Sequence, residues 1–281
     1  MAVPFSLRLI RWFFPKLESI APRLATRFFI RIFFSPFRYP RPEKEKPFVQ
    51  SAEKWEWRVN NKRVQGYSWG HSRQPYVLVV HGWAGRATQF RKFIPVFNEA
   101  GYGVVGFDGP AHGLSEGTRT NILEFEQLLR QVFQQMGQPA AVITHSFGGV
   151  AALYAMAQGL PVHKLINIAS PTIGDEVINT YLRAINGSAR TGQAFKAWMV
   201  ATYHKTFDEF SGLHLVRQIQ TPFSLLLWYD EDDKEVTKEH GLALKKVFPA
   251  AELMVTMGLG HNRILKDDAV IARCLAFVKQ A

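Results

Sequence analysis

A serine within a glycine-rich turn is the first candidate for chemistry in this sequence. Ser146 lies in the segment Thr144–Gly149 (THSFGG), which nearly matches the G-x-S-x-G turn that exposes a serine hydroxyl between a strand and a helix. Thr144 replaces the first glycine of the pattern and tightens the turn. Such a serine becomes a nucleophile when a histidine accepts its proton. We predict that Ser146 is a nucleophile; the alternative is a serine that only caps the following helix.

A histidine and a carboxylate must accompany such a serine, and both residue types follow later in the chain. His261 lies in Gly258–Asn262 (GLGHN), where two glycines predict a mobile loop that presents the imidazole to Ser146. An acid fixes the tautomer of this histidine and stabilises its cation. The run Tyr229–Val236 (YDEDDKEV) contains several acids, and the residue types alone leave the choice among them open.

Two backbone amides are candidates for binding the negative oxygen of a tetrahedral intermediate. The amide of Phe147 follows the serine at the start of a predicted helix, where the helix dipole favours negative charge. The amide of Trp83 lies in His81–Gly85 (HGWAG), whose glycines allow a sharp turn. Asp108–Ser115 (DGPAHGLS) is a further turn-rich loop. We expect this loop to shape the pocket, and His112 within it to form structural hydrogen bonds.

These segments each follow a short apolar run, and the runs alternate with helical patterns. Residues 54–69 predict an antiparallel hairpin with its turn at Asn60-Asn61. Buried parallel strands are predicted at Tyr76–Val80, Gly103–Phe107, Ala140–Thr144, Leu165–Ala169, Phe223–Trp228 and Glu252–Val255. Helices are predicted at Ile122–Gln135, Val150–Ala157, Lys238–Phe248 and Asp268–Phe277. The alternation predicts an α/β fold with a mostly parallel central sheet flanked by helices, and ligands bind at the carboxyl edge of such a sheet.

Two regions depart from this alternation. Residues 172–218 are longer than a crossover needs and predict an inserted helical cap, with helical character around 177–185 and 193–206. Residues 1–47 form an N-terminal extension and linker, and residues 1–41 hold eight Lys or Arg but one Glu. Ten aromatic residues lie among the first forty, and no uncharged run is long enough for a transmembrane helix. Short helices are predicted because the extension contains Pro4, Pro15, Pro22 and Pro36.

Two interpretations of the extension are open. Arg23, Arg27 and Arg31 follow helical spacing and form one cationic stripe on an otherwise apolar segment. One interpretation is an amphipathic helix that lies in an anionic membrane interface through residues 1–40. The other is a helical extension packed on the enzyme body or on a partner chain, with its arginines in water. Residues 40–50, which begin with PRPEKEKP, are proline-rich and charged and predict a linker.

The composition of the 281 residues is that of an ordinary globular protein, with 47% hydrophobic and 20% charged residues. The single cysteine, Cys274, excludes an internal disulfide, and its apolar surroundings predict burial. We expect a cytoplasmic protein, either free or peripheral on the inner face of the membrane. Most of the net charge of +11 lies in the extension without a zinc-finger or Walker pattern, so we expect no nucleic-acid partner. The histidines lack metal-ligand spacing, and the predicted chemistry requires no cofactor.

From about residue 54 to 280 the chain resembles the α/β-hydrolase superfamily, most of all a bacterial branch of serine hydrolases. The resemblance rests on His81–Gly85, Phe107–Gly113 (FDGPAHG), His145–Gly149 and Gly258–His261. It implies Ser146 as nucleophile and His261 as base, in the chain order serine, acid, histidine. It implies Asp233 as the acid, because this aspartate has the D-x-x-V spacing of the family. The alternatives for the acid are Asp230, Asp232 and, after the preceding strand, Asp175.

The sequence therefore predicts a carboxylesterase-like serine hydrolase that acts on a small-molecule acyl substrate. The hydrolase domain is predicted at 48–281, with an acyl-enzyme on Ser146 and an oxyanion hole formed by Trp83 and Phe147. A membrane-associated thioesterase or lipase-like enzyme is an alternative that the aromatic, cationic extension motivates. A protein that keeps the fold and binds without catalysis is another. The acyl group, the leaving group and the oligomeric state do not follow from the sequence.

Overall fold

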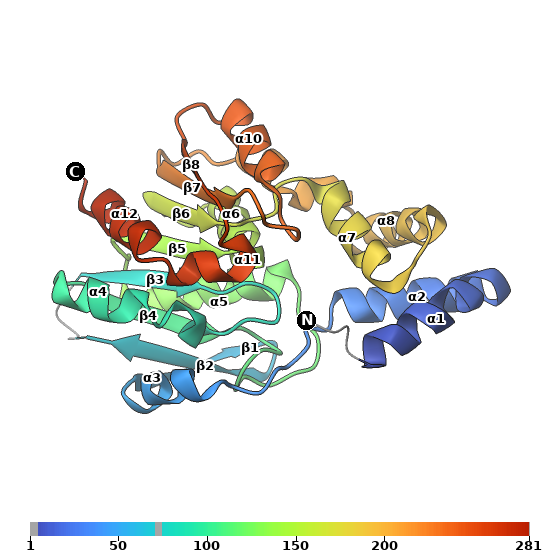
Figure 1. Ribbon diagram of the computed structural model, residues 1–281, viewed down its shortest axis with the longest axis horizontal. Helices are drawn as coiled ribbons and strands as arrows, with labels where there is room; N and C mark the ends of the chain where they lie inside the picture. Colours follow the sequence, from blue (N-terminus) through green and yellow to red (C-terminus); the bar gives the residue numbers. More distant parts are fainter. Residues whose placement is uncertain (1–4, 71–74, 281) are drawn as a thin grey trace.

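A mostly parallel sheet of eight strands forms the centre of the computed structural model, which describes residues 5–70 and 75–280 (Figure 1). Its strand order is β1-β2-β4-β3-β5-β6-β7-β8. The β1-β2 hairpin is antiparallel and β2 is antiparallel to β4, whereas the other neighbours are parallel. The strands are β1 (Glu53–Val59), β2 (Lys62–Trp69), β3 (Tyr76–Val80), β4 (Gly103–Asp108), β5 (Ala141–His145), β6 (Lys164–Ile168), β7 (Ser224–Asp230) and β8 (Glu252–Thr256). The predicted fold class is confirmed, with small shifts at strand ends.

Helices cover both faces of the sheet, which explains why the inner parallel strands β3 to β7 are largely apolar and buried. The prediction of a buried strand at Glu252–Val255 is wrong, because β8 is the edge strand and its Met254 and Val255 are exposed. One face packs against α5 (Ile122–Met136), α6 (Phe147–Ala157) and α10 (Lys238–Val247), and the other against α4 (Phe93–Glu99) and α12 (Asp268–Lys279). The four predicted helices are present, and α4 was not predicted. Helix α6 begins at Phe147 rather than at Val150, because two glycines let helical backbone start directly after β5. Cys274 of α12 is buried, as predicted.

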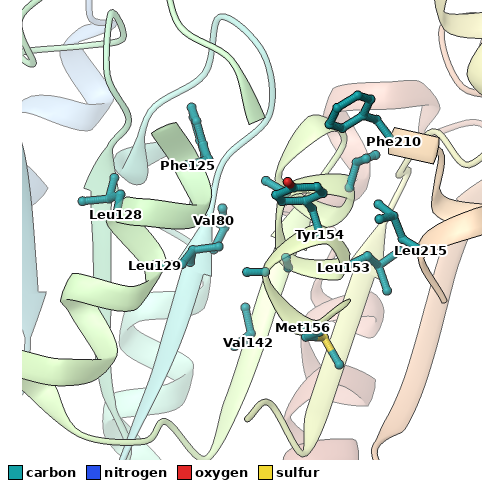
Figure 2. Packing of buried hydrophobic residues seen from close by; sticks show 14 of the residues in the cluster. Val80, Phe125, Leu128, Leu129, Val142, Leu153, Tyr154, Met156, Phe210 and Leu215 are labelled. Atoms are coloured by element: carbon teal, nitrogen blue, oxygen red, sulfur yellow. The ribbon is translucent and has the colours of Figure 1, made fainter. Parts of the chain in front are cut away.

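The interval between β6 and β7 forms the predicted helical cap. It contains α7 (Gly174–Ile185), α8 (Ala189–Tyr203), a 3-10 turn η3 (Phe207–Phe210) and α9 (Gly212–Leu215). Figure 2 shows the base of the cap, where Phe210 and Leu215 lie beside Leu153 and Tyr154 of α6. The rings of Phe210 and Tyr154 stack with 5.7 Å between their centroids. The cap is therefore anchored on the helix that follows Ser146.

Two helices that precede the sheet pack on the cap, in a lobe at one end of the molecule (Figure 1). Helix α1 (Phe5–Ile20) lies against α7, and α2 (Pro22–Phe33) lies against α8. Phe14 and Phe29 are fully buried, and Phe29 meets Phe195 of α8 edge-on with 5.3 Å between ring centroids. The extension thus packs on the cap, and the side chains of Arg23, Arg27 and Arg31 are exposed. None of the described helices is long and apolar enough to cross a bilayer.

The prediction that prolines divide the extension into short helices is partly wrong, because Pro15 lies inside α1. A proline within a helix leaves the carbonyl four residues earlier without its N–H partner. Here that carbonyl belongs to Arg11, and the side-chain amide of Asn186, between α7 and α8, donates to it at 3.3 Å. The cap therefore supplies the missing hydrogen bond. The other prolines lie at the start of α2, after α2 and outside the described residues: Pro22, Pro36 and Pro4.

The segment that was expected to be a linker is bound to the domain that contains the sheet by buried ion pairs. It contains a 3-10 turn η1 (Glu43–Glu45) and α3 (Lys46–Gln50). Arg41 donates to the carboxylate of Asp108 at 2.9 Å, and Arg86 donates to Glu45 at 2.8 Å. Both carboxylates are buried. The expectation of a plain linker is therefore wrong, because the charged composition reflects paired interior groups rather than a solvated tether.

Candidate active site

Ser146 occupies a sharp turn between β5 and α6. Its backbone has φ +50° and ψ −123°, a conformation that residues other than glycine rarely adopt. Two close approaches maintain the turn. A Cβ atom on Gly148 would lie 2.4 Å from the carbonyl oxygen of Val80, and one on Gly149 would lie 2.3 Å from the hydroxyl oxygen of Ser170. Ser146 itself is partly exposed, so a substrate can reach this strained turn.

Thr144, which departs from the glycine-rich pattern, is accommodated by buried hydrogen bonds. Its hydroxyl oxygen lies 2.6 Å from the side-chain oxygen of Asn167 and 3.1 Å from the carbonyl oxygen of Ile166. Both partners belong to the neighbouring strand β6. The threonine therefore ties β5 to β6 and leaves the turn at Ser146 intact.

Asp233 and His261 form a hydrogen-bonded pair at the same edge of the sheet. Asp233 follows β7, and His261 lies on the one-turn helix α11 (Gly260–Arg263) after β8. The Oδ2 atom of Asp233 lies 2.7 Å from Nδ1 of His261. Its Oδ1 atom accepts the amides of Glu235 and Val236 at 2.8 and 2.9 Å. The fixed carboxylate holds a proton on Nδ1 and leaves Nε2 able to accept one.

Asp230 holds the backbone of the segment that carries His261. Its carboxylate accepts the amides of Leu259 and Gly260 at 3.0 and 2.8 Å and the hydroxyl of Thr256 at 2.7 Å. Burial raises the pKa of Asp230, but these hydrogen bonds outweigh burial and lower the pKa below its ordinary value. The segment is therefore a fixed helical turn, and the mobile loop that its glycines predicted is wrong.

The remaining alternatives for the acid, Asp232 and Asp175, contact other residues. Asp232 is exposed and accepts the amide of Gly258 at 2.9 Å. Asp175 lies on α7 in the cap and pairs with Lys196 at 2.5 Å. Of the aspartates that the sequence left open, the one in contact with the imidazole of His261 is therefore Asp233.

Ser146 and His261 are connected through the residue before the serine. The Nε2 atom of His145 donates to the backbone carbonyl of His261 at 2.8 Å, and the two imidazole rings lie 4.7 Å apart. Burial, followed by the proximity of His261, lowers the pKa of His145 to about 3, so its ring is neutral. Within the described residues Ser146 forms no hydrogen bond with His261, whose Nε2 has the carboxylate of Glu235 at 3.9 Å. No role for His145 follows from the sequence, in which its one signal is its place beside the serine.

The segment that contains Trp83 lies directly against the serine. A Cβ atom on Gly82 would lie 2.8 Å from the Cβ atom of Ser146. Within the described part of the chain, the amides of Trp83 and Phe147 donate no hydrogen bond to other protein groups. The amide of Phe147 is free because it is the first amide of α6 and no carbonyl precedes it within the helix, whereas Trp83 lies in a turn. Free N–H groups next to a serine are the donors that an oxyanion requires.

Two buried histidines support this segment. Nδ1 of His81 donates to the carbonyl of Gly82 at 2.7 Å, and its Nε2 accepts the amide of Gly109 at 2.8 Å. His112 donates to the carbonyl of Pro110 at 2.9 Å. Burial lowers the pKa of His81 and lowers that of His112 well below its ordinary value, so both rings are neutral. His112 thus has the structural hydrogen bond that the sequence predicts.

A cavity of about 410 Å³ lies on the cap, between α7, α8 and the turn at Phe207. Asp175, Lys196 and Val200 line it, and none of the predicted catalytic residues does. It is therefore separate from the segments that meet at Ser146. Among the described residues no cluster of His, Cys, Asp or Glu could hold a metal ion.

Comparison with known proteins agrees with this fold. Residues 77–273, more than half of the chain, match the sequence profile of the Alpha/beta hydrolase family. The chain belongs to the Alpha/beta hydrolase family. This membership confirms the superfamily that the motifs indicated and supports a hydrolase; the bacterial branch stays a prediction.

Two relatives of this hydrolase match parts of its chain. The "Magnesium-chelatase 30 kDa subunit" of Rhodobacter capsulatus is 33% identical over 116 residues, 38% of this chain and 40% of that protein. The "Serine hydrolase-like protein" of Homo sapiens is 32% identical over 131 residues, 43% of this chain and 64% of that protein. Each match spans less than two thirds of the relative. An esterase structure from Pyrococcus furiosus superposes with a TM-score of 0.66 at 21% identity, over 87% of this chain and 98% of that one, and shows the shared fold.

Proposed function

We propose that this hydrolase cleaves a carboxylic ester or a similar acyl substrate through an acyl-enzyme on Ser146. The observation that supports it best is the buried contact between Asp233 and His261, with 2.7 Å between Oδ2 and Nδ1, beside the strained turn at Ser146. The names of an esterase and a serine hydrolase-like protein among its relatives support the same reaction class. The name of the Rhodobacter capsulatus relative does not describe hydrolysis, so a direct test of the serine is needed.

The reaction begins when Oγ of Ser146 attacks the carbonyl carbon and its proton passes to Nε2 of His261. Asp233 keeps the other proton on Nδ1 and stabilises the imidazolium. The amides of Trp83 and Phe147 donate to the oxyanion. Collapse of the tetrahedral intermediate breaks the bond to the leaving alcohol, which takes the proton from Nε2. A water molecule then attacks the acyl-enzyme with His261 as base, and the carboxylic acid and free serine are released.

The first proton transfer requires Ser146 and His261 to come within hydrogen-bond reach, about 2.6–3.2 Å between Oγ and Nε2. In the structure Nε2 instead has Glu235 at 3.9 Å. Catalytic hydrogen bonds often tighten only when substrate is bound. The mechanism therefore requires the side chains of Ser146 and His261 to turn toward one another when substrate binds.

A fluorophosphonate probe tests the proposal without knowledge of the substrate, because it labels activated serines. We expect labelling of the wild-type chain and of Ser51→Ala, which changes an exposed serine. We expect none in Ser146→Ala, whose p-nitrophenyl ester hydrolysis should fall by a factor on the order of 10⁶. An unlabelled wild-type chain without esterase activity would instead support a fold that binds without catalysis. Hydrolysis that survives Ser146→Ala in purified protein would show that Ser146 is not the nucleophile.

A further inference from the structure

The outer side of α1 carries large apolar side chains that remain exposed, although the ammonium group of Lys16 lies 3.2 Å from the ring centroid of Trp12. These exposed residues follow helical spacing and are Leu9, Trp12, Phe13 and Ile20. Trp12 is 63% exposed and Ile20 is 84% exposed. The opposite side of the helix packs into the core through Phe14 and its neighbours. Helix α1 is thus apolar on both sides, and a helix of this kind needs a partner on each side.

The outer side of α2 is cationic. Arg23, Arg27 and Arg31 are exposed, and within the described residues they form no ion pair. Arg8 and Lys16 of α1 are exposed as well. Five positive charges therefore lie on the outer sides of two adjacent helices that also present apolar side chains.

The one acid of this region faces the cap. Glu18 is the only acid among residues 5–42. Its carboxylate accepts the amide and hydroxyl of Ser188 at 3.0 and 2.9 Å and the hydroxyl of Thr191 at 2.5 Å. These bonds attach α1 to the start of α8 and direct the negative charge away from the outer surface. What remains outside is apolar and positive.

We propose that the outer surface of α1 and α2, the docking face, binds an anionic lipid bilayer. Its tryptophan, phenylalanine and aliphatic side chains enter the interface, and its cations contact lipid phosphates. A second copy of this chain is a poor occupant, because a symmetric contact would bring the same five cations together. The exposed apolar groups match the apolar part of a bilayer, and the surrounding cations, with the only acid of the two helices bound to the cap, match its anionic lipid headgroups. The proposal goes beyond the esterase reaction because it needs neither Ser146 nor His261.

The docking face and the cap belong to one lobe, since α1 packs on α7 and α2 packs on α8 (Figure 1). Docking therefore brings the cap to the bilayer. This position favours an acyl substrate that is itself dissolved in the membrane, as for a lipase-like enzyme, and this last step rests on the proposed function.

Co-sedimentation of the full chain with vesicles of equimolar phosphatidylcholine and phosphatidylglycerol tests the proposal. The charge-reversed variant carries Arg23→Glu, Arg27→Glu and Arg31→Glu. The matched control makes the same charge change at exposed cations outside the lobe and carries Lys54→Glu, Lys246→Glu and Lys279→Glu. We expect the first variant to lose about 100-fold or more in partition coefficient, because each cation near such a surface contributes several-fold. We expect a much smaller change in the control, and weak binding of the wild type to pure phosphatidylcholine.

A neutral variant tests the apolar half of the docking face. Trp12→Ser with Ile20→Ser leaves the net charge unchanged and should lower the partition coefficient by about 10-fold or more. Circular dichroism and the thermal midpoint establish that each variant folds. Deletion of residues 1–47 is unsuitable, because it would leave Asp108 and Arg86 buried without their ionic partners Arg41 and Glu45.

Equal vesicle binding by the wild-type and charge-reversed chains would overturn the proposal, and so would an equal loss in the matched control. A dimer that Trp12→Ser with Ile20→Ser abolishes, without vesicle binding, would assign the docking face to a second copy. Vesicle binding should persist in Ser146→Ala, so failure of the docking proposal and failure of the proposed function give different results.

Discussion

The sheet edge around Ser146 and the lobe formed by α1, α2 and the cap are held together by different interactions. At the edge, buried carboxylates fix the backbone: Asp230 accepts two amides beneath His261, and Asp233 accepts two amides as well as the imidazole. In the lobe, aromatic packing dominates, as where Phe29 meets Phe195. The geometry of the edge thus depends on directional hydrogen bonds, and the stability of the lobe depends on how completely side chains fill its core.

This difference predicts different responses to substitution. A buried carboxylate that loses its partner costs the free energy of an unpaired charge and also displaces the group it orients. A core side chain that is shortened leaves a cavity, which lowers the free energy of unfolding. We therefore expect changes at the edge to alter the rate more than the stability, and changes in the lobe to do the opposite.

The largest effect on rate, after loss of the serine, is expected from Asp233→Asn. It removes the charge that stabilises the imidazolium and favours the wrong tautomer of His261, so kcat for ester hydrolysis should fall by a factor on the order of 10⁴. Asp232→Asn is the matched control, because Asp232 is exposed and contacts Gly258 rather than the imidazole. Steady-state kinetics and thermal midpoints of both variants test the comparison. Similar losses in the two would show that the acid is not Asp233.

In the lobe, Phe29→Ala should lower the free energy of unfolding of α1 and α2 by about 3–5 kcal/mol, because it opens a cavity beside Phe195. Ester hydrolysis by the folded protein should change little. Phe37→Ala, at an exposed ring, should cost less than about 0.5 kcal/mol. Hydrogen exchange of the two helices measures the local stability. A large loss of kcat in Phe29→Ala would show that the lobe and the catalytic edge are not independent.

A smaller effect on rate is expected at His145, which contacts the edge without an assigned chemical step. His145→Leu removes the donor to the His261 carbonyl and should lower kcat about 10-fold to 100-fold with little change in KM. His145→Gln should keep most of the activity, because its amide nitrogen reaches a position similar to Nε2 of the histidine. Equal losses in the two variants would mean that the hydrogen bond does not position His261.

Much of the candidate site was predictable because its signals are local. Gly148 and Gly149 indicate that the backbone after Ser146 approaches β3 and β6 closely. The apolar run before Ser146 indicates a buried strand. The choice of Asp233 over Asp230 was not available from residue types, because both are buried aspartates after β7 and only their partners differ. His145 was missed for the same reason, since its partner is a carbonyl far along the chain.

The lobe was less predictable because its pattern is ambiguous. Aromatic residues occur on both sides of α1, and the buried side depends on where α7 lies. Pro15 could not be placed inside a helix from the sequence, because the compensating hydrogen bond comes from Asn186 in the cap. Helix α4 was missed because it is short and contains Pro95. In the sequence Arg41 and Glu45 are typical of solvated charges, because their buried partners Asp108 and Arg86 are far away along the chain.

The smallest predicted effect is the dependence of the unfolding free energy on pH, which arises from buried histidines at the sheet edge and not from the lobe. Burial lowers the pKa of His145 to about 3, whereas an unfolded histidine titrates near 6.5. Between these values the unfolded chain binds one more proton at His145 than the folded chain. The free energy of unfolding therefore falls as the pH falls, by at most about 1.4 kcal/mol per pH unit for this histidine. Burial of His81 and His112 acts in the same direction.

Glutamine does not titrate, so His145→Gln removes the proton that the unfolded chain takes up at this position. The slope of the unfolding free energy against pH between 6 and 4 should therefore fall by an amount equivalent to about one bound proton. Urea denaturation at several pH values measures this slope. Leu24→Ser, on the exposed surface of α2, adds no titratable group and should leave the slope unchanged. An unchanged slope in His145→Gln would mean that His145 takes up its proton in the folded protein. The packing of that ring against the His261 carbonyl would then be looser than the 2.8 Å contact implies.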